Sequence, residues 1–353
     1  MGKIYSIQYL RGIAAMLVVF LHIRTLLPDF LKPFVINGGI GVDIFFIISG
    51  FIIYYATQKN TEADPKTYIT KRAFRIWPLF FVVWFITSIL AFQNQPFNKV
   101  IQALFFIHND YTQGAPGFGF NMIGPAWTLT FEVIFYTIFM FACLISHKYR
   151  GVICVFLLII IPSAIQYHFN GSVSFSTYTT ANVDSSHFAF GLIRVLGCNI
   201  YIEFGVGILL SMIVSKIRIV NGSLLATIFS TLIFVTCIYI ILNVKVSELE
   251  RFLLALFTFL SALLFGFGCI KELKALSLLG DISYSLYLCH WMVIRLIIEF
   301  FPEQWTMEQW WIKVPVILSI IFIISLLMNK LIEKPSIRLA RFMLSNTFKT
   351  SPA

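Results

Sequence analysis

Ten apolar stretches, each close to the length that crosses a bilayer, dominate this chain of 353 residues. A transmembrane helix needs about 20 mostly apolar residues. Only 12% of the residues are charged, against roughly 25% in soluble domains, so a soluble fold is excluded. The sequence predicts an all-α, polytopic membrane helix bundle. The predicted spans are residues 5–23, 38–57, 76–92, 124–146, 151–167, 198–215, 223–243, 252–270, 278–298 and 312–332.

The distribution of lysine and arginine predicts the orientation. Of the 26 basic residues, 17 fall in the segments that are cytoplasmic when the N-terminus is inside, as the positive-inside rule requires. Ten spans return the C-terminus to the same side, so both termini are predicted to be cytoplasmic. These segments are residues 1–4, 58–75, 147–150, 216–222, 271–277 and 330–353.

The basic residues lie between apolar runs, so the net charge of +10 indicates contact with membrane lipid and no nucleic-acid partner. We expect residues 1–335 to form one integral membrane domain and residues 336–353 a basic cytoplasmic tail. Two long loops, 88–124 and 168–197, separate the spans, and the short apolar run 100–108 is typical of an interfacial or re-entrant segment.

The first span carries two ionisable side chains, Arg11 and His22. Eleven residues at about 100° each return almost to the starting direction, so both lie on one helix face, roughly 16 Å apart. Small side chains between them, Ala14, Ala15 and Val18, would leave a channel along that face. Because ionisable groups in a membrane are costly, they indicate a pathway or an active site.

Asp43 lies near the outer end of the second span, as His22 does in the first. A carboxylate beside a histidine holds its tautomer and stabilises the imidazolium. We therefore predict that Asp43 orients His22; a structural ion pair is the alternative.

Arg72 and Arg75 follow Lys71 at the predicted cytoplasmic start of the third span. Three residues apart on a helix, the two arginines project on one side and can bind phosphates. Basic residues at this edge can equally be topological anchors.

Two further polar faces occur within spans. Glu132 has hydroxyl neighbours one turn away on each side, Thr128 and Tyr136. In the ninth span Tyr287 and His290 share a face. A buried histidine is usually a packing residue, but two histidines in the membrane favour function.

Several motifs are absent: His-Glu-x-x-His, the P-loop and Gly-x-Ser-x-Gly do not occur, and no carboxylate-rich cluster is present. We expect no metal site.

Five segments in order resemble the acyltransferase-3 family of bacterial integral membrane proteins that modify cell-surface carbohydrates. They are Arg11-x10-His22, Gly41-Val-Asp43-x-Phe-Phe-x-x-Ser-Gly-Phe, Arg72-x-x-Arg75-Ile-x-Pro, Trp127-x-Leu-x-x-Glu132-x-x-Phe-Tyr136 and Ser283-Tyr284-Ser-Leu-Tyr287-x-x-His290, with a closing Glu333-Lys-Pro335.

The resemblance implies ten spans and transfer of an acyl group, commonly acetyl from acetyl-CoA, to a sugar hydroxyl. It implies that His22 acts at the reacting centre and that Arg72 and Arg75 hold the nucleotide end of the donor. The acceptor would be a cell-surface or lipid-linked carbohydrate, and the protein would lie in a bacterial inner or cytoplasmic membrane.

These patterns combine into one hypothesis. The donor phosphates stop at the basic inner face, and the pantetheine arm runs along the Arg11–His22 face. His22 accepts the proton of the acceptor hydroxyl, or carries the acyl group itself. We predict His22, Asp43 and Glu132 as catalytic, with Glu132 orienting the acceptor or a catalytic side chain. The predicted donor-binding residues are Arg11, Lys71, Arg72, Arg75, Tyr287 and His290.

The alternative from another class is a secondary transporter or flippase of lipid-linked sugars that uses the same charges as a transport path. The absence of an internal repeat disfavours it. A structural assembly partner is a third interpretation. The sequence leaves open the acceptor, the acyl length and the oligomeric state.

Overall fold

The computed structural model describes residues 4–58, 64–216, 224–266 and 272–349. Parts of five predicted cytoplasmic segments, at 1–3, 59–63, 217–222, 271 and 350–353, lie outside the described residues, as do 223 and 267–270 of two predicted spans.

The described chain is helical, without a strand, and each of the ten predicted spans overlaps at least one helix. Within the described residues, eight helical segments are long and apolar enough to cross a membrane, and a ninth span arises if the bent pair α12–α13 is one crossing. The helix Glu248–Phe265, at the predicted span 252–270, is not among them. The all-α membrane prediction is confirmed. The helices are α1 (Tyr5–His22), α2 (Ile40–Ala56), α4 (Pro65–Ala91), α5 (Phe97–Leu104), α6 (Trp127–Ile145), α7 (Arg150–Asn170), α8 (Phe190–Leu196), α9 (Tyr201–Val214), α10 (Leu224–Asn243), α11 (Glu248–Phe265), α12 (Lys274–Asp281), α13 (Ser283–Phe300), α14 (Trp310–Met328) and α15 (Lys334–Lys349).

Local sequence sets several helix ends. Asp64 caps α4 by accepting a hydrogen bond from the Thr67 amide at 3.0 Å, and Pro65 suits the first helical position. Ser247 and Glu250 form a capping box at the start of α11. At Ile282 the chain bends by 64° between α12 and α13.

Helix α2 is the centre of the bundle and packs against α1, α9 and α11. Two-thirds of its span (67%) is buried, whereas only 17% of the α10 span is. A Cβ on Gly50 would collide with the Phe204 backbone of α9, so glycine is what lets these two helices approach. Helices with little buried surface, such as α10, turn large apolar side chains outward, as a lipid-facing helix does.

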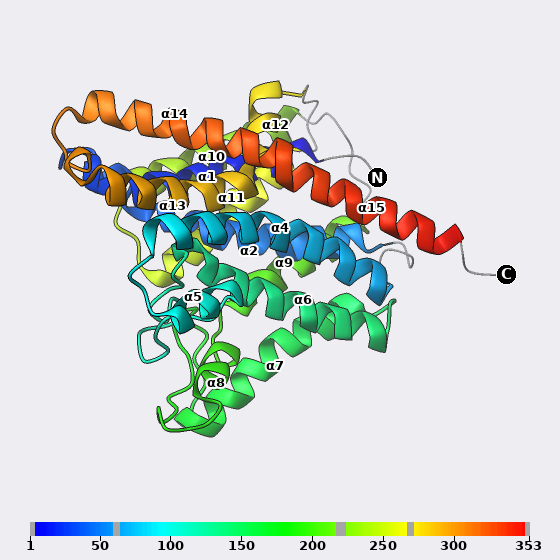
Figure 1. The fold of residues 1–353 in the computed structure, drawn as a ribbon. Helices are drawn as coiled ribbons and strands as arrows, with labels where there is room; N and C mark the ends of the chain where they lie inside the picture. Colours follow the sequence, from blue (N-terminus) through cyan, green and yellow to red (C-terminus); the bar gives the residue numbers. More distant parts are fainter. Residues whose placement is uncertain (1–3, 59–63, 217–223, 267–271, 350–353) are drawn as a thin grey trace.

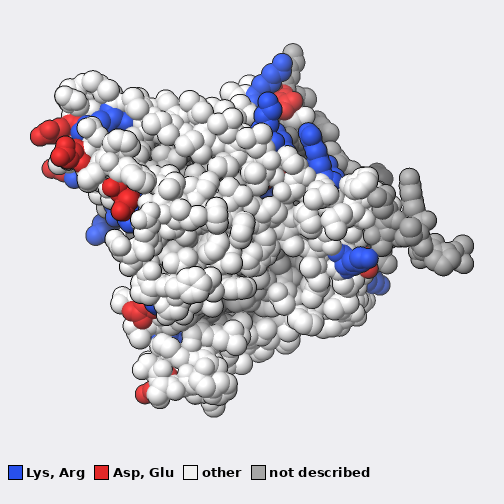
Figure 2. Space-filling view, viewed as in Figure 1, with Lys and Arg blue, Asp and Glu red and all other residues white. Residues whose placement is uncertain are grey.

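Charged side chains gather at the two ends of the bundle. The face seen in Figure 2 is almost free of them between these ends. The start of α1 and helix α15 lie at the same end, whereas α5 and α8 lie at the other (Figure 1). This arrangement suits a multi-pass membrane protein.

The predicted tail forms part of α15, which continues from α14 through a π-helical turn, Asn329–Glu333, and packs against α4. Glu333 is buried there and accepts hydrogen bonds from Ser285 at 2.6 Å and Asn329 at 2.9 Å. The structure shows no break at residue 335.

Candidate active site

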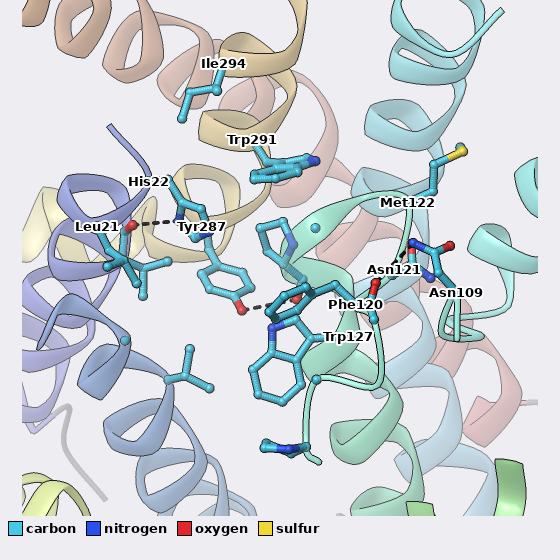
Figure 3. A pocket seen from close by; sticks show the side chains of 18 of the residues that line it. Leu21, His22, Asn109, Phe120, Asn121, Met122, Trp127, Tyr287, Trp291 and Ile294 are labelled. Carbon is cyan, nitrogen blue, oxygen red and sulfur yellow. Dashed lines mark hydrogen bonds between the residues drawn. The ribbon is translucent and has the colours of Figure 1, made fainter. Parts of the chain in front are cut away.

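A cavity of about 1020 Å³ opens among α1, α2, α13 and the loops at the end of the bundle that carries α5 and α8. We call it the outer cavity. His22 and Leu21 lie on one side and Phe120 and Asn121 on the other, with Trp291 and Trp127 between them (Figure 3). Its aromatic wall residues are Phe92, Phe120, Trp127, Tyr178, Tyr287, Trp291 and Trp305.

A second, smaller cavity of about 150 Å³ lies among α1, α2, α4, α6 and α13. We call it the inner pocket. Its charged lining residues are Arg11, Arg72, Arg75 and Glu132, so three cations face one carboxylate. The structure thus brings together four charged residues that were singled out in three separate segments of the sequence.

Val42 and Tyr287 line both cavities and therefore lie between them. The Tyr287 hydroxyl lies 3.0 Å from Thr128 Oγ1 and 3.2 Å from the Pro125 carbonyl. These contacts fix the ring at the boundary between the pocket of arginines and the cavity that holds His22.

The hydrogen bonds of His22 define its tautomer. Its Nδ1 lies 2.8 Å from the Val18 carbonyl and 3.3 Å from Nε2 of His290. A carbonyl only accepts, so Nδ1 carries the proton and Nε2 is the unprotonated nitrogen. The Nδ1 of His290 lies 3.0 Å from the Leu286 carbonyl, which by the same logic leaves its Nε2 as an acceptor for His22. The neutral His22 therefore keeps a basic Nε2, as a general base requires.

Asp43 does not orient His22. Its carboxylate accepts a hydrogen bond from Nε of Arg251 at 2.6 Å, and Arg251 also donates to the Tyr178 hydroxyl at 2.6 Å and the Gly39 carbonyl at 2.8 Å. The pairing that we predicted for Asp43 is wrong because α11 supplies a cation, while Val18 and His290 already satisfy Nδ1 of His22. Asp43 still lines the outer cavity.

Three other predicted site residues, His290, Glu132 and Lys71, do not lie where their predicted roles would place them. His290 is fully buried behind His22 and lines neither cavity, so its neighbour is His22. Glu132 accepts from Tyr136 and, at 3.4 Å, from Ser49, and it lines the inner pocket instead of the outer cavity. Lys71 lines neither.

The predicted channel along α1 is filled at two of its three small residues. Ala14 and Ala15 are fully buried. A Cβ on Gly41 of α2 would collide with the Ala14 backbone, so the two helices touch at this level. Of the three, only Val18 lines a cavity. The two cavities instead approach each other beside Val42 and Tyr287.

The sequence reasoning missed Arg251, Tyr178 and Trp291. Arg251 and Tyr178 were assigned to loops, and their partner Asp43 is remote in sequence. Trp291 makes an edge contact with His22, with 5.3 Å between ring centroids. Its position next to His290 was the one available signal. Among the described residues no group of His, Cys, Asp or Glu is placed to hold a metal ion.

Residues 4–330 match the family model described as an acyltransferase domain. The chain belongs to the acyltransferase-3 family. The match covers most of the described bundle, including both cavities, so the resemblance that the motifs indicated is confirmed.

Similar curated proteins extend this finding. The acyltransferase-3 chain is 26% identical to the exopolysaccharide production protein ExoZ of Rhizobium meliloti over 274 residues, covering 74% of this chain and 78% of ExoZ. It is also 26% identical to the O-acetyltransferase OatA of Staphylococcus aureus over 373 aligned positions, covering 95% of this chain but 57% of OatA. No solved structure is detectably similar.

Proposed function

We propose that this protein is an O-acyltransferase that moves an acetyl group from cytosolic acetyl-CoA to a hydroxyl of a cell-surface carbohydrate. The observation that carries the proposal is the meeting of two unlike cavities at Val42 and Tyr287. One is lined by arginines and the other by aromatic side chains and a histidine with a free Nε2. Family membership and the names of OatA and ExoZ support the reaction and the carbohydrate acceptor.

The inner pocket would receive the donor. Its volume of about 150 Å³ is below the roughly 300–1,000 Å³ of pockets that enclose drug-sized ligands. It therefore suits the slender pantetheine arm, while the phosphates contact Arg72 and Arg75 at its mouth. With both termini cytoplasmic, in a bacterial cytoplasmic membrane, this mouth faces the CoA pool.

The outer cavity would hold the acceptor with its hydroxyl at His22. Nε2 of His22 takes the hydroxyl proton as the oxygen attacks the thioester carbonyl. When the tetrahedral intermediate collapses, the carbon–sulfur bond breaks and the CoA sulfur receives the proton from Nε2. The products are the acetyl ester and CoA thiol, with no net proton uptake. Such base catalysis contributes about 10²–10⁴ in rate.

The test is acetyl transfer and donor binding measured on the same purified His22→Gln protein. Turnover should fall by about 10²-fold or more, because the base is lost. Affinity for acetyl-CoA should change little, because the phosphates lie away from His22. Near-normal turnover in this variant would refute the proposal. In the unsubstituted protein, an acetyl group trapped on His22 after rapid quenching would instead favour the acyl-histidine route.

A further inference from the structure

The outer cavity is strongly cationic. Four basic side chains line it, Arg24, Lys99, Arg251 and Arg295, against one carboxylate, Asp43. Arg251 is occupied by its ion pair with Asp43. Within the described parts of the chain, the other three form no ion pair. Cations that line a cavity without a counter-ion favour an anionic ligand.

Two side chains of helix α13 that line this cavity, Trp291 and Arg295, each carry a buried hydrogen-bond donor without a partner in the described part of the chain. Trp291 Nε1 and Arg295 Nε are buried and have no hydrogen-bond partner among the described residues. Both side chains line the cavity, and a spacing of four places them on one face, about 6 Å apart along the axis. Because buried donors without partners are costly, these two are suited to a ligand that accepts hydrogen bonds.

Trp291 and Arg295 lie at increasing distance from His22 along α13. Trp291 touches His22, with ring centroids 5.3 Å apart, and Arg295 lies one helical turn farther along α13. The Arg295 guanidinium rests over the Phe92 ring at 5.0 Å, which keeps it extended at the cavity wall. A hydroxyl placed at His22 therefore lies beside Trp291, and Arg295 follows one turn farther along the same face of α13.

We propose that the acceptor is an acidic saccharide whose anionic group, a carboxylate or a phosphate, binds Arg295 while the hydroxyl to be acylated lies at His22. The aromatic walls bury the apolar faces of the sugar rings, and Lys99 and Arg24 add positive charge around the anion. This inference rests on the proposed function and names the class of its acceptor.

The test compares three probes of one size on the purified protein: methyl β-glucuronide, glucose 1-phosphate and methyl β-glucoside. Ligand-observed NMR gives the affinity of each, and labelled acetyl-CoA gives transfer to each. We expect at least one acidic probe to bind about ten-fold or more tightly than the glucoside, as expected of a charge-assisted hydrogen bond. Preference for the glucuronide identifies a sugar carboxylate, and preference for the phosphate identifies a phosphorylated or phosphate-linked acceptor.

Arg295→Gln should remove most of this preference, and Arg295→Lys should keep part of it. Lys313→Gln is the matched control, because Lys313 is a basic residue in the first turn of α14, the next long helix after α13, and does not line the cavity. Equal affinity for the glucoside, or a preference that survives Arg295→Gln, would overturn the inference. So would displacement of the acidic probe by 3′,5′-ADP, since the cations would then bind the donor.

The two proposals fail differently. Arg295-dependent binding of an acidic probe without any acetyl transfer would retain the anion site and contradict the acyltransferase function. Equal transfer to the neutral and acidic probes would retain the function and contradict the anion site.

Discussion

A histidine with a carboxylate partner is the familiar arrangement of a general base, but here the partner of His22 is a second histidine. Neutral His290 accepts from Nδ1 of His22 at 3.3 Å and brings no negative charge into the membrane, where an ion costs several kcal/mol. It fixes the tautomer of His22 while stabilising the imidazolium less than a carboxylate would. In the proposed mechanism His290 is therefore a positioning residue.

Replacing His290 by leucine should lower kcat by about ten-fold or more, because the Nδ1 proton of His22 loses one of its two acceptors and keeps only the Val18 carbonyl. The KM for acetyl-CoA should stay nearly constant, since His290 lines neither cavity. Steady-state kinetics per folded enzyme gives both numbers. His290→Gln, whose amide oxygen can accept the same hydrogen bond, should recover part of kcat. If both variants are less stable but keep the kcat of the parent, His290 has only a packing role.

Residue spacing predicted contacts within one helix and failed for contacts between helices. The hydroxyl beside Glu132 was expected from a spacing of four, and Tyr136 does donate to it. The partners of Asp43 and His22 come from residues 208 and 268 positions away. Such pairs leave no periodic pattern in the sequence, because they depend on how the helices pack against one another.

At the scale of elements, α4 places a basic first half before an apolar second half. The predicted span began at residue 76, where the apolar run begins, but the helix begins at Pro65. The charged first turns of α4 are also helical, because Asp64 caps them. A periodic pattern of apolar residues is not needed where a helix extends out of the membrane. This extension places Arg72 and Arg75 on one continuous helix at the inner pocket.

Arg72→Ala and Arg75→Ala should each weaken acetyl-CoA binding by about ten-fold or more, because a charge-assisted phosphate contact is worth about 1.5–3 kcal/mol. Calorimetry in detergent measures this affinity. Lysine at either position should restore only part of it, because it lacks the planar fork. Lys66→Ala, on an exposed turn of the same helix, is the control. Unchanged binding in both arginine variants would leave these residues as topological anchors.

The loop between α5 and α6 forms one wall of the outer cavity and is held by His108. Its Nδ1 donates to the Gly117 carbonyl at 2.8 Å, and its Nε2 lies 3.0 Å from Thr130 Oγ1 of α6. Burial lowers the pKa of His108 from 6.5 to about 4. The unfolded loop therefore binds more protons than the folded loop between these values, and the loop loses stability as pH falls from about 6.5 to 4.

At pH 5 this loss should be about 2 kcal/mol. Hydrogen exchange of residues 105–120 should accordingly rise between pH 7 and pH 5 after correction for the intrinsic rate. In His108→Gln the exchange should no longer depend on pH beyond that correction, whereas His187→Gln, in the other long loop, should behave as the parent. The same pH response in all three proteins would exclude His108 as its source.

The whole molecule has two chemically different ends. The start of α1 and helix α15 lie at one end (Figure 1), so the predicted orientation would turn the inner pocket toward the cytoplasm and the outer cavity away from it. The sequence predicted the apolar helices well, because they follow from composition along the chain, whereas the orientation stays a prediction. It did not predict the outer cavity, whose walls come from loops without periodicity.

The orientation can be tested with single cysteines in a chain whose native cysteines are replaced by serine. Phe188→Cys, at a residue 97% exposed in the loop before α8, should react with an impermeant maleimide in intact cells. Tyr149→Cys, exposed between α6 and α7, should react only after the membrane is opened. The reverse pattern would place the arginines away from the CoA pool and contradict the proposed donor route.

The boundary at Val42 and Tyr287 has an electrical consequence. With a polar cavity on either side, much of the membrane potential falls across this thin apolar layer, where each unit charge that crosses gains or loses about 2.3 kcal/mol per 100 mV. On the proposed route only the neutral acetyl thioester would cross this layer, so its passage would be indifferent to voltage, and the donor phosphates would stay on the side of the inner pocket. The proposed acyltransferase would then deliver an activated acetyl group across the membrane without conducting ions.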